Sequence, residues 1–166
     1  DSNIFSINND EIASSITDLD FVKNVGIKKI YPDKIKININ EHKIVAVISN
    51  NENKYMLSKE GHIIENYNNK FNSLPIIYGK NTENYFPYFY KLLNDINFDL
   101  SKIKYLKYFE SNRWDIFLKD GKLIKLSSDK SEAKESLANF IAIYSDKKFE
   151  QYKIFDFRVK NQLILK

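Results

Sequence analysis

The stretch from Tyr31 to Ile48, "YPDKIKININEHKIVAVI", sets the strongest limit on how this chain can fold. Ile35, Ile37 and Ile39 alternate with Lys and Asn residues, and this period of two predicts a strand with one face buried. The following residues, 43–49, are apolar at nearly every position, which favours a central strand of a sheet. The "NEH" between them predicts a hairpin whose isoleucines pack under helices.

The composition favours one ordinary domain or two small ones, built on a substantial apolar core. The chain has 166 residues, of which 43% are hydrophobic, with 12 Phe and 11 Tyr. No run of residues is long and apolar enough for a membrane span, so we expect any anchor or targeting segment to lie outside this sequence. The absence of cysteine excludes disulfides and thiolate chemistry within it.

The net charge of +4 does not indicate a nucleic-acid-binding protein. Only two of the 26 basic residues are Arg, and the lysines are scattered along the chain rather than clustered on one element. An RNA-binding α+β domain would show exposed aromatic residues interleaved with Arg on one sheet. We therefore expect no nucleic-acid partner.

Further local signals predict helices and hairpins along the rest of the chain. A helix is expected from Asn9 or Asp10, and another from about Thr82 with apolar residues on one face. The Asp120-Gly121 pair favours a type I′ hairpin turn, and Asp129 with Glu132 resembles a helix capping box. The chain ends in a hairpin, "YKIFDFRV" and "QLILK".

No catalytic or metal-binding motif is present in the sequence. It lacks a Gly-rich phosphate loop, a G-x-S-x-G elbow and an H-E-x-x-H motif. His42 and His62 have no second ligand at a spacing typical of zinc sites. We expect neither an enzyme nor a cofactor, and no small-molecule substrate.

The order of several weaker motifs resembles the extracytoplasmic part of the bacterial FtsQ/DivIB cell-division family. Its POTRA domain is matched by Phe21-Val22, Tyr31-Pro32, the three alternating isoleucines, Glu41 and Ala46. Its second domain is matched by Leu74-Pro75, Gly79, Arg113-Trp114, Leu118, Gly121, Leu126 and Asp156-Phe157-Arg158. The chain departs from the family at Asn161-Gln162, where the final turn usually carries Gly, although Asn tolerates a left-handed conformation.

This resemblance implies an α+β fold with two domains. Residues 1–50 are expected to form a truncated POTRA domain that lacks its first strand and first helix. Residues 51–166 are expected to form a larger antiparallel β-sheet with flanking helices. The family also implies a cytoplasmic tail and a membrane anchor upstream, so the chain would be the periplasmic part of a single-pass inner-membrane protein.

The function implied by the resemblance is that of a scaffold at the division septum, which links FtsB- and FtsL-like partners. These partners would add a strand to the C-terminal edge of the sheet. The partner-binding residues carried over by position are Arg158, Val159, Asn161, Leu163 and Leu165, with Val159 and Leu163 as exposed anchors and Arg158 facing a partner carboxylate. Phe155 and Phe157 are expected in the core. The alternative is a POTRA-type component of outer-membrane protein assembly or secretion, which would show repeated POTRA units or a barrel.

Overall fold

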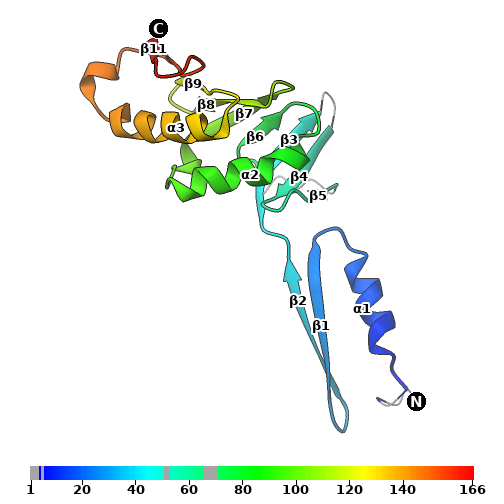
Figure 1. Ribbon diagram of the computed structural model, residues 1–166. Coiled ribbons are helices and arrows are strands. Elements are labelled where there is room, and N and C mark those ends of the chain that lie inside the picture. Colours follow the sequence, from blue (N-terminus) through cyan, green and yellow to red (C-terminus); the bar gives the residue numbers. More distant parts are fainter. Residues whose placement is uncertain (1–3, 5, 51–52, 66–70) are drawn as a thin grey trace.

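The computed structural model describes residues 4, 6–50, 53–65 and 71–166, and these residues form two separate β-sheets. The first is a two-stranded hairpin near the N-terminus, and the second has nine strands and extends to the C-terminus (Figure 1). We call residues 9–41 the N-terminal unit and residues 44–166 the main unit.

The N-terminal unit consists of one helix beside a long hairpin. Helix α1 (Asn9–Thr17) begins at Asn8, whose side chain accepts a hydrogen bond from the Asp10 amide. Strands β1 (Val22–Ile30) and β2 (Lys34–Glu41) pair antiparallel through a turn that contains the cis Tyr31–Pro32 peptide. The predicted hairpin between residues 34–40 and 43–49 is therefore wrong, because β2 pairs with the strand before it.

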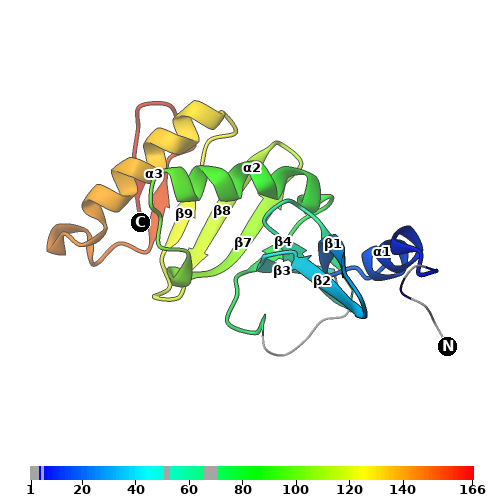
Figure 2. The ribbon, with the colours of Figure 1, turned by 90° about the horizontal axis from the view of Figure 1, so that it is seen from below.

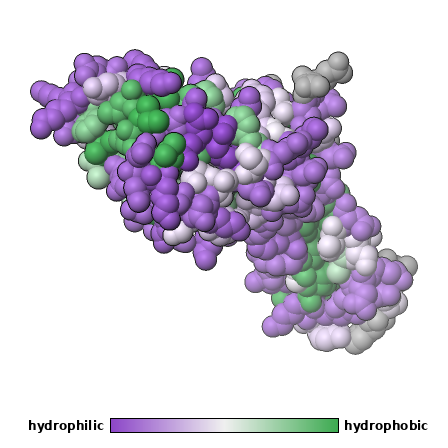
Figure 3. Space-filling model, turned by 45° about the horizontal axis from the view of Figure 1, so that its top comes forward, coloured by the Kyte–Doolittle hydropathy of each residue, from purple (hydrophilic) through white to green (hydrophobic). Residues whose placement is uncertain are grey.

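The apolar side chains of the N-terminal unit are half-buried or exposed, with the exception of Val22. Ile37 and Ile39 are 42% and 47% exposed, so the predicted burial of the alternating isoleucines is wrong for these two, whereas Ile35 is half-buried. Helix α1 lies along β1 and contributes no fully buried residue. Figure 3 shows the resulting apolar strip in green at the lower right, on the hairpin end of the molecule.

The main unit is one continuous mixed sheet with the strand order β11-β10-β9-β8-β7-β6-β3-β4-β5. Strand β6 runs parallel to both β3 and β7, and β10 runs parallel to β9, while the other pairs are antiparallel. The strands are β3 (Ile44–Asn50), β4 (Asn53–Ser58), β5 (Ile63–Ile64), β6 (Ile76–Tyr78), β7 (Ile103–Phe109), β8 (Arg113–Leu118), β9 (Leu123–Lys125), β10 (Ile154–Asp156) and β11 (Ile164–Leu165).

Helices α2 (Thr82–Asp95) and α3 (Lys130–Tyr144) lie across the same face of this sheet (Figure 2). Helix α2 buries Phe86, Phe89 and Leu93, and the Phe89 ring stacks on Trp114 of β8 with centroids 4.7 Å apart. Helix α3 is capped by Asp129, whose carboxylate accepts hydrogen bonds from two amides of the first turn. The two helices and the sheet therefore enclose a single apolar core.

The predicted α+β fold is confirmed, with a mixed sheet in place of the expected antiparallel one. Strand β3 was assigned by sequence to the first unit, within residues 1–50. In the structure it pairs with β4 and β6 of the main sheet. The two sheets thus meet between Glu41 and Ile44, at the short connection from β2 to β3.

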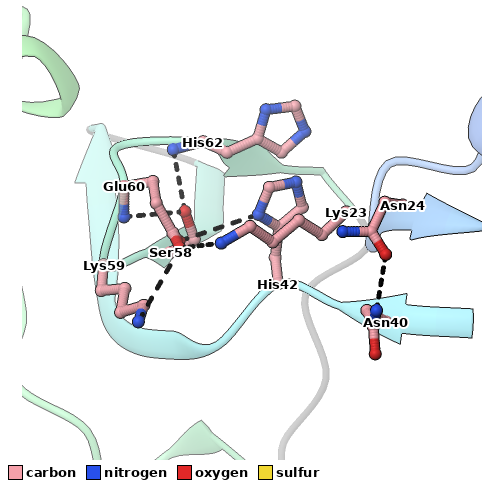
Figure 4. A network of polar contacts seen from close by, with 8 residues as sticks. All are labelled: Lys23, Asn24, Asn40, His42, Ser58, Lys59, Glu60 and His62. Carbon is pink, nitrogen blue, oxygen red and sulfur yellow. Dashed lines mark hydrogen bonds and ion pairs between the residues drawn. The ribbon is translucent and has the colours of Figure 1, made fainter.

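Both histidines of the chain lie where the N-terminal unit meets the main sheet (Figure 4). The rings of His42 and His62 stack with centroids 4.4 Å apart and planes 12° from parallel. Glu60, in the turn between β4 and β5, accepts a hydrogen bond from Lys23 of β1 at 2.6 Å. This bond lowers the pKa of Glu60, although burial acts in the opposite direction. We call these four residues the junction.

Candidate protein-binding edge

The C-terminal hairpin lies at one end of the main sheet, and its first strand, β10, is anchored in the core. Phe155 of β10 is fully buried, and its ring meets Phe140 of α3 edge to face at 5.0 Å. Phe157 is 7% exposed, so the expected core positions of both phenylalanines are confirmed. Strand β10 pairs with β9 on one side, and β11 pairs antiparallel with β10 on the other. Strand β11 is therefore the last strand of the sheet.

The backbone of β11 is hydrogen-bonded on its inner side only, among the residues that the structure describes. Lys166 and Ile154 exchange two bonds, with the Lys166 amide donating at 3.1 Å and the Ile154 amide at 2.9 Å. In an antiparallel pair, hydrogen-bonded and non-hydrogen-bonded residues alternate. The N–H and C=O groups of Leu165, next to Lys166, therefore point away from β10.

The side chains of this edge alternate between the core and solvent. Leu163 and Leu165 are half-buried and pack against the main core, whereas Ile164 between them is 40% exposed. The expected exposure of Leu163 is therefore only partial. Ile164 was missed as a candidate residue, although the alternation in "QLILK" places it on the opposite face from both leucines.

A tight turn carries Val159 and Asn161 into solvent. The Gln162 amide donates to the Val159 carbonyl at 3.1 Å, and Asn161 has a φ of 58°. Asn161 thus adopts, as expected, the left-handed conformation that Asn tolerates in place of Gly. Val159 is 48% exposed, as expected for an exposed anchor.

Arg158 is already held by an acidic neighbour within its own chain. Its Nε and Nη2 donate to the two carboxylate oxygens of Asp156 at 2.8 and 2.6 Å, and its backbone amide donates to Oδ1 at 3.1 Å. These bonds lower the pKa of Asp156 and raise that of Arg158. A partner carboxylate would therefore have to share or replace this contact, which the sequence motif did not reveal.

A second acidic residue lies near this pair on β8. Asp115 is 4% exposed, with its Oδ1 3.3 Å from Nε of Arg113, and burial raises its pKa despite the nearby arginines. The pKa of Asp115 is thus raised above the usual range of aspartate, and the pKa of Asp156 is lowered below it. Together with both arginines they form a charged cluster beside the C-terminal edge.

The part of the chain that the structure describes shows no group of three or more His, Cys, Asp or Glu residues arranged to hold a metal ion. None of its helices is long and apolar enough to cross a membrane. The sequence-predicted site residues do lie together, at the turn and in the outer strand of the C-terminal hairpin.

Family models match most of the chain in two consecutive segments. The model described as POTRA domain, FtsQ-type, matches residues 1–42. The model described as cell division protein FtsQ/DivIB, C-terminal, matches residues 46–158. The gap between the matches, residues 43–45, lies at the end of the connection from β2 to β3 and the start of β3.

Curated relatives carry the same family name. FtsQ of Rickettsia bellii is 30% identical over 97% of this chain and 60% of its own length. FtsQ of Rhizobium meliloti is 25% identical over 75% of this chain and 41% of its own length. The chain thus spans 41–61% of the length of the FtsQ relatives reported first.

A solved structure, that of the major extracytoplasmic domain of DivIB from Geobacillus stearothermophilus, covers 65% of this chain with a TM-score of 0.46 and 15% identity. The family matches cover both units, and their order agrees with the division of the fold into a hairpin unit and a main sheet. The chain belongs to the FtsQ/DivIB family of cell-division proteins.

Proposed function

We propose that this chain is a non-enzymatic scaffold that binds an extracytoplasmic segment of an FtsB- or FtsL-like division protein at the outer edge of β11. The observation that carries the proposal is the free edge of the main sheet, where the backbone N–H and C=O groups of Leu165 point outward. An incoming strand gains main-chain hydrogen bonds at such an edge, and alternate side chains supply the specificity.

The apolar residues beside this edge support the proposal. Edge strands of proteins that stay monomeric are usually short or protected by charge, because an open edge invites pairing with another chain. Strand β11 is short, yet Ile164 within it is 40% exposed, and Val159 in the preceding turn is 48% exposed. Such side chains are the anchors that an added strand would cover.

The proposed location is the division septum, on the outer side of the inner membrane. The relatives extend well beyond the region that this chain matches, and an anchor in the remaining part would hold the domain at the membrane. The domain would then place β11 within reach of the extracytoplasmic segments of other anchored division proteins.

A proline at Leu165 tests the edge directly. Leu165→Pro removes an outward N–H, which proline at an edge strand can lack without loss of the internal ladder. Leu165→Ala removes the same side chain but keeps the donor. We expect the proline variant to lose capture of the FtsB-like extracytoplasmic segment from the same genome, and the alanine variant to retain it. Equal capture by both variants, with unchanged circular dichroism, would exclude strand addition at β11.

A further inference from the structure

A groove runs beside the C-terminal edge, between helix α3 and the loop that precedes β11. Its volume is about 610 Å³. One wall is the exposed face of α3, and the other is formed by the loop between β10 and β11. The groove reaches Leu163, the residue directly before the edge strand β11 at which we place the partner strand.

The two walls differ in chemistry. The loop wall carries the apolar side chains of Phe157, Val159 and Leu163. The helix wall carries Glu132 and Glu135, three residues apart on one face of α3. An occupant that fits both walls needs apolar groups on one side and positive charge on the other.

The groove is acidic although the whole chain is basic. Asp129, Glu132 and Glu135 contribute three negative charges, and Lys160 contributes one positive charge, whereas the chain carries +4. Asp129 caps the helix, so the amides of the first turn already compensate its charge. Glu132 and Glu135 are the carboxylates that remain to face an occupant.

Lys160 forms an ion pair with Glu132 at the helix wall of the groove. Its Nζ lies 3.6 Å from Oε1 of Glu132, while Oε2 of Glu132 accepts a bond from the Ser127 hydroxyl at 2.8 Å. Lys160 is 73% exposed at its side chain, so this contact is easily exchanged. Glu135 is exposed one turn further along the helix, and its carboxylate has no hydrogen-bonding or ion-pair partner among the described residues.

We propose that this groove binds a segment of the partner in which apolar residues alternate with Lys or Arg. The inference rests on the proposed function, because the segment is taken to continue from the strand that pairs with β11. The partner's apolar residues cover Val159 and Leu163, and its cations face Glu132 and Glu135. Charge at such a rim sets the rate and selectivity of association more than the final affinity.

Charge reversal at Glu135 tests the inference in the presence of the partner. We expect Glu135→Lys to weaken capture of the FtsB-like segment about tenfold at low salt, and the difference to shrink at high salt. Glu110→Lys is the control for charge reversal away from the groove. Glu110 is also an exposed carboxylate, in the turn after β7, and its ion pair with Lys80 joins two side chains that are more than three-quarters exposed. Glu110→Lys should change capture less than about twofold.

The outcomes separate this inference from the proposed function. If Leu165→Pro abolishes capture while Glu135→Lys leaves it unchanged, strand addition stands and the acidic groove is not a binding site. If Glu135→Lys strengthens capture, the partner segment is acidic and the inference is wrong. If both variants capture normally, both proposals fail.

A second measurement does not depend on the natural partner. A short capped peptide that alternates Lys with Val should shift the amide NMR signals of Glu132, Glu135 and Leu163, whereas a peptide that alternates Glu with Val should not. Equal shifts with both peptides, or none with either, would overturn the inference.

Discussion

The two units of this chain differ in how each of them is stabilised. The main unit buries Phe86, Leu137, Ile116 and Phe155 at 2% exposure or less between its helices and sheet. In the N-terminal unit, the strand β2 has no fully buried residue, and β1 has only Val22. The main unit thus carries its own core, whereas the hairpin depends on backbone pairing, on α1 and on the junction. Two adjacent sheets in one chain can therefore differ widely in their resistance to opening.

The largest expected effect is a substitution in the main core. Phe155→Ala removes a fully buried ring that contacts Phe140, and we expect it to lower the free energy of unfolding by about 3–5 kcal/mol. Ile37→Ala in the hairpin should cost less than about 0.5 kcal/mol, because Ile37 is already 42% exposed. Urea unfolding of both variants measures the difference. Similar losses would show that the hairpin is as well packed as the main core.

Hydrogen exchange compares the units within the unmodified chain. Amides of the β1–β2 pair, such as that of Ile27, should open with a free energy about 2 kcal/mol or more below that of Leu106 in β7. The reason is that few apolar contacts must be lost to open the hairpin. Equal protection at both strands would mean that the units unfold together.

The junction offers a smaller effect that concerns the contact between the units. Glu60→Gln keeps the size of the side chain but removes the charge that holds Lys23, at a cost of less than about 1 kcal/mol. Because the pKa of Glu60 is lowered in the folded chain, this contribution is present at neutral pH and is lost as the pH falls through that pKa. We expect the N-terminal unit to become more mobile in the variant.

Spin labels measure how firmly the junction holds the two units together. Labels at Asn38→Cys and Lys80→Cys report the spacing of the units, since the chain has no cysteine of its own. The distance distribution should broaden in Glu60→Gln. In the unmodified chain it should broaden only as the pH falls through the lowered pKa of Glu60, because the contact with Lys23 is then lost. An equally narrow distribution in the variant and at low pH would contradict the expectation.

The smallest effect on stability is expected at the C-terminal edge. Val159→Glu should change the free energy of unfolding by less than about 0.5 kcal/mol, because Val159 lies in an exposed turn. The melting temperature should therefore hardly change. Capture of the FtsB-like segment should nevertheless be lost. Ile141→Glu is the control, because Ile141 is also an exposed apolar residue but lies on α3, and this variant should keep capture. If Val159→Glu unfolds the main unit, the residue belongs to the core and not to a binding edge.

Local features of the fold were predictable because their signals lie within a few residues. The turn predicted at Asp120-Gly121 does join β8 and β9. The predicted type I′ geometry is wrong, because that turn needs a positive φ at both residues and only Gly121 has one. Asp129 caps α3 as predicted, although Glu132 bonds to Ser127 instead of completing the capping box. The apolar face of α2 was also predicted, because its period matches the helix.

The strand pairing could not be predicted in the same way. Backbone hydrogen bonds carry no residue identity, so the sequence does not say whether β3 pairs with β2 or joins β6 across a long connection. At the candidate site, the family motif pointed to the C-terminal hairpin, which the structure places at one edge of the main sheet. It did not reveal that Asp156 holds Arg158 or that Ile164 is the exposed residue of the edge strand.

The strand order also fixes the distance between the two ends of the main sheet. Strand β5, next to the turn that carries Glu60 of the junction, lies at one end of the sheet, and β11 lies at the other. Neighbouring strands lie about 4.8 Å apart, so the eight spacings keep these ends roughly 38 Å apart along the hydrogen-bonding direction. The sheet therefore acts as a spacer between its two ends. A force applied between the ends acts perpendicular to the strands, along their hydrogen bonds, so neighbouring strands separate one pair at a time. The two-residue strands β11 and β5 would detach first.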